Sequence, residues 1–112
     1  MPALSAQHCS ELSADDAAMD DHEASTFIQQ LDPQWQLNAE GLSISHSYSF
    51  ENYYQTIAFV NVIAQIAHQQ DHHPELIVSY NRCTVNYSTH KVGGLSINDF
   101  ICAAKINAAL TL

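Results

Sequence analysis

The chain has 112 residues and a mass of 12.4 kDa, which is the size of one domain with a single hydrophobic core. Its formal charge is −9, and protonating all seven histidines would still leave it negative, which excludes nucleic acid and anionic lipid as partners. The longest apolar run in the middle of the chain, residues 57–60, is far too short to span a membrane.

Residues 1–10 contain no Lys or Arg and no apolar stretch of signal-peptide length, so we expect a flexible arm on a cytoplasmic protein. The three cysteines, Cys9, Cys83 and Cys102, are widely spaced and form no Cys-x-x-Cys pair. This pattern favours reduced thiols over a disulfide framework or a thiolate metal site. We expect Cys83 and Cys102 in the core and Cys9 in the loose arm.

The first half of the chain predicts a short helix and a hairpin. A helix within residues 20–31 is indicated by Phe27, Ile28 and Leu31, and the Asp-Pro pair that follows ends it. Apolar and polar residues then alternate on both sides of a turn signal at residues 38–41, which is typical of a β-hairpin.

Residues 50–70 carry the strongest helical pattern in the chain. Two apolar stripes run along this helix, so we expect the second stripe to pack on another helix or on a second subunit. The helix should end at His72, because Pro74 forces His73 into an extended conformation. One stripe consists of Ile57, Val60, Ala64 and Ala67, and the other of Phe59, Ile63 and Ile66.

The second half of the chain predicts another hairpin and a last helix. Residues 76–80 and 83–88 alternate around a tight turn at residues 81–82. Ser96 and Asp99 form a Ser-x-x-Asp start for the last helix. The order α-β-β-α-β-β-α favours an α+β fold, with a four-stranded antiparallel sheet and helices packed on one face.

Four of the seven histidines fall within 23 positions: His68, His72, His73 and His90. Clustered imidazoles suit proton transfer or metal binding, because their pKa lies near neutrality. We expect His68 and His72 on one face of the helix, with His73 pointing away from that face. His90 should end a strand, on the face opposite the apolar side chains, and Asp99 should lie in the first turn of the last helix.

Three interpretations stay open from these residues alone. The histidines could be ordinary surface or core residues, with Asp99 as a capping carboxylate. His68 and His72 could bind a metal with Asp71 or His90, although the glutamate that hydrolytic zinc helices place between two histidines is missing. Alternatively, two or three imidazoles could surround an organic substrate that loses one proton and gains another.

The residues that could carry chemistry follow one another at fixed spacing. The motif is His68-x-x-x-His72-His73-Pro74, followed by Tyr80, His90 and Asp99. It resembles the signature of the pterin-4a-carbinolamine dehydratase family, bacterial type, and the resemblance covers residues 35–104. Two positions depart from the family pattern: relatives often have an acid in place of His68 and an aromatic residue in place of Leu76.

This resemblance implies a hydro-lyase that dehydrates 4a-hydroxytetrahydrobiopterin, or a related tetrahydropterin carbinolamine, to quinonoid dihydropterin without a metal or another cofactor. It implies that His73 and His90 are the acid–base pair, that His72 orients the pterin, and that Asp99 holds an imidazole, so that these four form the catalytic set. The substrate-binding residues it implies are Asp71, His72, His73, Pro74, Ser88, Thr89, His90 and Lys91.

The resemblance further implies one dehydratase domain over residues 1–112 that recycles the pterin of aromatic amino-acid hydroxylases, with a phenylalanine hydroxylase as functional partner. The two stripes of the helix at residues 50–70 predict a homodimer or homotetramer. Because animal relatives also act as dimerisation cofactors of a transcription factor, a binding module is the alternative function. A complete histidine set is superfluous for a pure adaptor and favours the enzyme.

Overall fold

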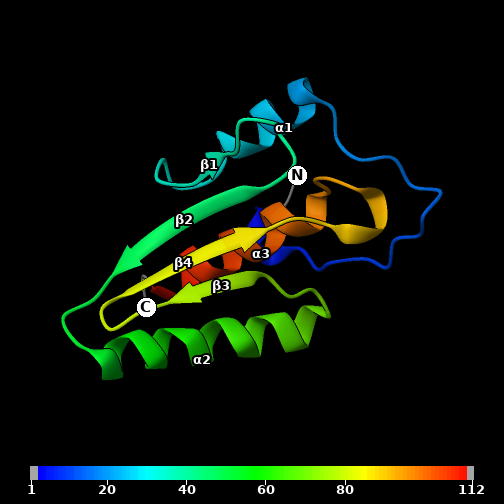
Figure 1. Ribbon diagram of the computed structural model, residues 1–112. Coiled ribbons are helices and arrows are strands. Elements are labelled where there is room, and N and C mark those ends of the chain that lie inside the picture. The colour runs from blue at the N-terminus through cyan, green and yellow to red at the C-terminus, as the bar shows by residue number, and fades with distance from the viewer. Residues whose placement is uncertain (1–2, 111–112) are drawn as a thin grey trace.

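The computed structural model describes residues 3–110 and arranges them in the predicted order of helices and strands, with two additional 3-10 turns (Figure 1). The predicted α+β fold with a four-stranded antiparallel sheet is confirmed. The elements are η1 (Leu4–Ala6), α1 (Asp21–Ile28), β1 (Gln36–Leu37), β2 (Ile44–Ser49), α2 (Tyr53–Gln70), β3 (Glu75–Val78), β4 (Arg82–Tyr87), η2 (His90–Val92) and α3 (Ile97–Leu110).

The four strands form one sheet in the order β1-β2-β4-β3. Its centre is the β2–β4 pair, which runs from Ile44 opposite Tyr87 to Ser49 opposite Arg82. Because side chains alternate across a strand, one face takes the apolar residues of both strands and the other takes serine, threonine and asparagine.

Both long helices pack on the apolar face of the sheet, as the side chain of Tyr48 on β2 demonstrates. Its ring centroid lies 4.5 Å from that of Phe59 on α2, and its hydroxyl donates to Asn107 Oδ1 on α3 at 2.7 Å. The ring centroid of Phe27 on α1 lies 5.5 Å from that of Phe100, so α1 packs on the start of α3. The predicted burial of two cysteines is confirmed, since the core includes Ile44, Ile63, Cys83, Val85, Tyr87, Leu95, Phe100, Cys102 and Ile106.

Helix α2 turns one of its two apolar stripes toward the core. Phe59 and Ile63 are buried, whereas Ile57 and Val60 of the other stripe are only half-buried and Ala64 is exposed. Within residues 3–110 no helix, α2 included, combines the length and apolar character needed to cross a membrane.

The predicted end of this helix at His72 is wrong, because α2 ends at Gln70. Asp71 takes a left-handed conformation with φ 51°, and the amide of His72 donates to the carbonyl of Ala67 at 3.1 Å. The amide of Asp71 donates to the carbonyl of His68, which completes the Schellman pattern of a helix C-terminus. His72 therefore lies beyond the helix and does not share a helical face with His68.

The prediction that His90 ends a strand is also wrong. Strand β4 ends at Tyr87, and His90 begins η2. The amide of Thr89 donates to the carbonyl of Gly94 at 2.7 Å, so an isolated bridge closes a short loop that contains η2. Gly93 closes η2 in the left-handed region at φ 70°, which glycine adopts without a steric cost. Strand parity consequently does not set the direction of the His90 side chain.

The N-terminal arm follows α3 and then the end of α2. Leu4 is buried, and Lys105 Nζ donates to the carbonyl of Ser5 at 2.9 Å. Cys9, which we expected in a loose arm, packs with its Sγ 3.6 Å from Cys102 Sγ. Flexibility of residues 1–10 stays a prediction, and residues 1–2 lie outside the described residues.

Candidate active site

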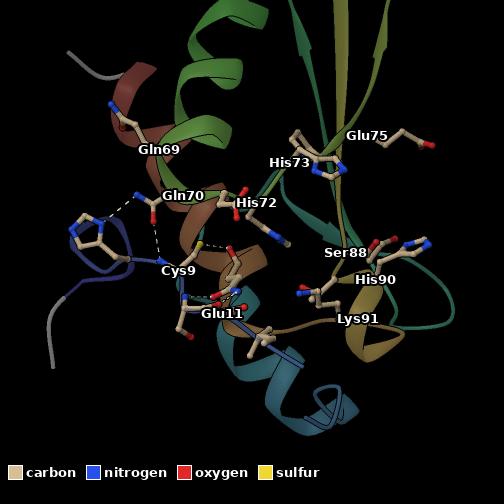
Figure 2. A pocket seen from close by; sticks show the side chains of 18 of the residues that line it. Cys9, Glu11, Gln69, Gln70, His72, His73, Glu75, Ser88, His90 and Lys91 are labelled. Carbon is tan, nitrogen blue, oxygen red and sulfur yellow. Dashed lines mark hydrogen bonds between the residues drawn. The ribbon is translucent and has the colours of Figure 1, made fainter. Parts of the chain in front are cut away.

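A cavity of about 1280 Å³ lies where α2 leads into β3 and β4 leads into η2 (Figure 2). The chain reversal at the end of α2 brings one group of predicted residues to it, and the η2 loop brings the other. All eight residues predicted to bind substrate line this cavity: Asp71, His72, His73, Pro74, Ser88, Thr89, His90 and Lys91.

A buried carboxylate holds His72. The Nε2 atom of His72 lies 2.6 Å from Asp99 Oδ1, and the Asp99 side chain is fully buried. The imidazole also stacks on Tyr87, with ring centroids 5.4 Å apart and an angle of 20° between the planes. Burial lowers the pKa of His72, but the hydrogen bond and the negative charge of Asp99 outweigh burial, so the pKa is raised. The ring is oriented and keeps its proton to a higher pH than an ordinary imidazole.

The second oxygen of Asp99 ties the start of α3 to the η2 loop. Asp99 Oδ2 accepts from the Ser96 amide and from the Thr89 hydroxyl, each at 2.9 Å. The Thr89 and Ser96 hydroxyls are 2.6 Å apart. Ser96 directly precedes α3, so the carboxylate three residues later caps the helix as the Ser-x-x-Asp pattern predicts. Asp99 does not line the cavity, and it contacts the site through its hydrogen bond with His72.

His73 and His90 enter the cavity from two separate segments. His73 follows His72 in the link to β3, where Pro74 favours an extended backbone, and His90 opens η2. Figure 2 shows His72 and His73 on one side of the cavity and His90, beside Ser88, on the other, and all three line it. Both His73 and His90 are exposed, and among residues 3–110 no hydrogen bond engages either ring. Both nitrogens of each ring are therefore available to a ligand.

Besides Asp99, two further residues of the sequence motif lie outside the cavity. His68 is exposed on α2, and Tyr80 is exposed in the turn between β3 and β4. The metal interpretation paired His68 with His72, but His72 lies past the helix end and its Nε2 contacts Asp99. Across the described residues, 3–110, no group of three or more His, Cys, Asp or Glu side chains is arranged to hold a metal ion.

The N-terminal arm supplies one wall of the cavity through residues 8–12, which we did not predict from the sequence. The arm has no periodic pattern, so its path depends on side-chain contacts that spacing does not reveal. Six polar residues also line the cavity and were not predicted: Ser43, Gln69, Gln70, Glu75, Asn86 and Asn98. Gln70, Glu75 and Asn98 each lie directly beside a predicted site residue in the sequence, whereas Ser43, Gln69 and Asn86 do not.

Comparison with known proteins gives a family for this arrangement. The family described as Pterin 4 alpha carbinolamine dehydratase matches residues 17–109. A Nitrosomonas eutropha relative named for this dehydratase is 54% identical over 88 residues, which cover 79% of this chain and 76% of the relative. A Legionella pneumophila (strain Corby) relative with the same name is 43% identical over 107 residues, covering 96% of this chain and 95% of the relative.

Solved structures agree with the fold. A crystal structure from Brucella melitensis, titled transcriptional coactivator/pterin dehydratase, superposes with a TM-score of 0.76 at 31% identity and covers 81% of this chain and 96% of that chain. A pterin dehydratase-like protein, titled a RuBisCO assembly factor in the alpha-carboxysome, has a TM-score of 0.58 at 17% identity, covers 67% of this chain and 87% of that chain, and shares the fold alone.

The fold, the histidine-lined cavity and these matches define an enzyme of the hydro-lyase class. The chain belongs to the pterin-4a-carbinolamine dehydratase family.

Proposed function

We propose that this chain dehydrates 4a-hydroxytetrahydropterin to quinonoid dihydropterin, with His73 and His90 as the acid–base pair. In this reaction the 4a-hydroxyl leaves as water while N5 loses its proton, so one group must donate a proton and another must accept one. No electrons are transferred, and two imidazoles suffice. The observation that carries the proposal is the convergence of His72, His73 and His90 on one cavity from two segments of the chain.

The three rings take different roles because their surroundings differ. His72 Nε2 is held by Asp99, so this ring is suited to orient the pterin through its other nitrogen. His73 and His90 have unengaged rings at the cavity, as proton transfer to and from a ligand requires. Asp99 acts on the reaction through the tautomer and charge of His72, much as the carboxylate of a catalytic triad does.

The remaining lining residues would hold the pyrimidine edge of the pterin, which presents both hydrogen-bond donors and acceptors. Asp71, Ser88 and Lys91 are exposed at the cavity and offer complementary groups. Pro74 shapes the wall beside His73. Thr89 is buried with its hydroxyl engaged by Asp99, so its contribution is to position that carboxylate.

The substrate links this chain to aromatic amino-acid hydroxylases, which release the carbinolamine. We assign the chain to the recycling of their pterin in the cytoplasm, with a phenylalanine hydroxylase as functional partner. A test is to couple the chain to such a hydroxylase under limiting pterin: hydroxylation should be sustained, and an unchanged rate would contradict this assignment.

The exposed apolar surface supports a homodimer or homotetramer. Strand β3 forms one edge of the sheet. Its residue Ile77 is 59% exposed, and Tyr80 in the turn that follows is 62% exposed. An apolar edge strand favours pairing with another chain, and Val62 on α2 is also exposed. Light scattering should show an oligomer that Ile77→Lys or Val62→Glu dissociates. A wild-type monomer would contradict this proposal.

The central experiment follows the ultraviolet decay of the carbinolamine with and without protein. His73→Ala and His90→Ala should each lower turnover by about 10²- to 10⁴-fold while circular dichroism shows an intact fold. The double variant should retain almost no activity. His68→Ala, at an exposed histidine outside the cavity, is the matched control and should match the wild type.

The same assay separates the competing functions. A chelator should leave the rate unchanged, whereas a loss of activity would favour the metal interpretation. Near-normal dehydration by the double variant would overturn the acid–base assignment. A wild-type chain that leaves the spontaneous decay unchanged would favour the binding-module alternative, the role that the coactivator title of the Brucella melitensis protein names.

A further inference from the structure

Side chains of two helices hold the N-terminal arm against the cavity by hydrogen bonds at two points. We call residues 8–12 the strap. The amide of Cys9 donates to Gln70 Oε1 at the end of α2 at 2.8 Å. Ser10 and the buried Asn98 of α3 form a reciprocal pair, with the Ser10 amide donating at 3.1 Å and the Asn98 amide group donating back at 2.9 Å. The strap is therefore a built wall of the cavity.

Between these two fastenings lies a pair of thiols from opposite ends of the chain. Cys9 Sγ in the strap is 3.6 Å from Cys102 Sγ in α3. Cys102 is fully buried, whereas Cys9 is half-buried and lines the cavity, where Figure 2 shows it beside Gln70. A disulfide requires a sulfur separation of about 2.05 Å, so a small shift of the strap side chain would join them.

The surroundings of the two thiols make Cys9 the reactive partner. The hydrogen bond with Cys102 lowers the pKa of Cys9, and the nearby His72 lowers it further, while burial opposes both. The same hydrogen bond, followed by burial, raises the pKa of Cys102. Cys9 also lines the cavity, whereas Cys102 is fully buried, so Cys9 attacks first and Cys102 follows as the resolving thiol.

We propose that Cys9 and Cys102 form a redox-modification site that reacts with a small peroxide entering through the cavity. The Cys9 thiolate attacks one oxygen of hydrogen peroxide and breaks the O–O bond, which yields a sulfenic acid at Cys9 and, after proton uptake, one water. The Cys102 sulfur then attacks the Cys9 sulfur, the S–O bond breaks, and the leaving hydroxide takes the Cys102 proton as a second water. Two thiols are oxidised by two electrons, and the peroxide is reduced to two waters.

The product ties the strap covalently to α3 beside His72. In the reduced protein only hydrogen bonds and packing hold the strap, so it can open locally while the core stays folded. The disulfide removes that opening and fixes the wall of the cavity that faces the η2 loop. In a reducing compartment such a disulfide would form transiently and report oxidation.

The test treats the reduced full-length protein with hydrogen peroxide and then counts free thiols after unfolding. The wild type should lose two of its three thiols, and peptide mass spectrometry should find residues 9 and 102 joined. Hydrogen exchange in the strap should slow on oxidation, and dithiothreitol should reverse both changes. Cys83→Ala is the matched control, because Cys83 is buried in β4 outside the cavity, and it should behave as the wild type.

Two variants test separately the oxidation of Cys9 and the attack by Cys102. Cys102→Ala should stop at the sulfenic acid of Cys9, which dimedone traps. Cys9→Ser, at a strap residue that leaves the core intact, should lose neither of its remaining thiols under the same treatment. The proposal is overturned if the wild type keeps all three thiols, if the bond forms between chains or includes Cys83, or if strap exchange is the same in both redox states.

Discussion

Replacing Asp99 with Asn removes the charge behind His72 while keeping the shape of the side chain. The oxygen that accepts from Ser96 and Thr89 can be retained by Asn, since both bonds fall on Oδ2. The change therefore falls on Oδ1, which accepts from His72 Nε2 at 2.6 Å and would become an NH₂ donor. The neutral imidazole must then accept at Nε2 and carry its proton on Nδ1, so the tautomer of His72 is inverted.

The size of the effect follows from this single bond. A hydrogen bond to a charged group contributes about 1.5–3 kcal/mol, so Asp99→Asn should lower the free energy of unfolding by about that amount. Asp99 raises the pKa of His72 above 6.5 in the folded protein. A base with a raised folded pKa contributes stability that is complete below its unfolded pKa and is lost as the pH rises through its folded pKa. The difference between wild type and variant should therefore be largest below pH 6.5 and shrink above it.

Two measurements check this prediction. Urea unfolding below pH 6.5 and above the folded pKa of His72 gives the stability difference, and NMR of the His72 ring gives its titration. In Asp99→Asn the His72 titration should move to lower pH. Asp15→Asn removes the same charge at an exposed site and should change neither quantity. An unchanged titration of His72 in Asp99→Asn would refute the reasoning.

Three further predictions concern the fold around the site. Asn107 Oδ1 accepts from Trp35 Nε1 at 3.1 Å and from the Tyr48 hydroxyl at 2.7 Å, so Asn107→Leu should lower the free energy of unfolding by about 2–4 kcal/mol in urea titrations. One ordinary hydrogen bond contributes about 1 kcal/mol net, so a loss below about 1 kcal/mol would contradict the presence of both bonds to Asn107. Burial lowers the pKa of His46 from 6.5. The stability that the neutral His46 ring contributes is therefore present above pH 6.5 and is lost as the pH falls through its folded pKa. Unfolding titrations across that range should show less acid destabilisation in His46→Phe than in the wild type. Equal acid sensitivity of the two proteins would contradict this effect of burying His46. Because Asp71 is left-handed, Asp71→Ala should be about 1 kcal/mol less stable than Asp71→Gly by thermal unfolding, and the reverse order would contradict the helix ending.

Periodicity was sufficient to predict the elements of the fold. The spacing of Phe59 and Ile63 identified α2, and the alternation around residues 81–82 identified the β3–β4 hairpin, because both patterns record which side chains face the core. The motif likewise predicted that His73 and His90 belong to one site. These features depend on local sequence or on a signature that spans several elements.

The errors fall where local backbone hydrogen bonds, or contacts between distant elements, decide the path of the chain. A Schellman motif with Asp71 in the left-handed conformation ends α2 at Gln70. A bridge between Thr89 and Gly94 closes a loop, so His90 lies in η2 and not in a strand. The strap has neither periodicity nor turn signals, and its course is fixed by Gln70 and Asn98 on distant elements. The spacing of apolar and polar residues along the chain contains no information on these contacts between distant elements.

The central claim is that His73 and His90 act on one pterin bound in the cavity. The most direct measurement is a crystal structure of the wild-type protein with a dihydropterin that resembles the product. The account predicts ring nitrogens of both histidines within about 2.6–3.2 Å of the N5 and C4a edge, directly or through one water, with His72 against the same heterocycle. A pterin seated outside this cavity, or one touched by neither His73 nor His90, would contradict it.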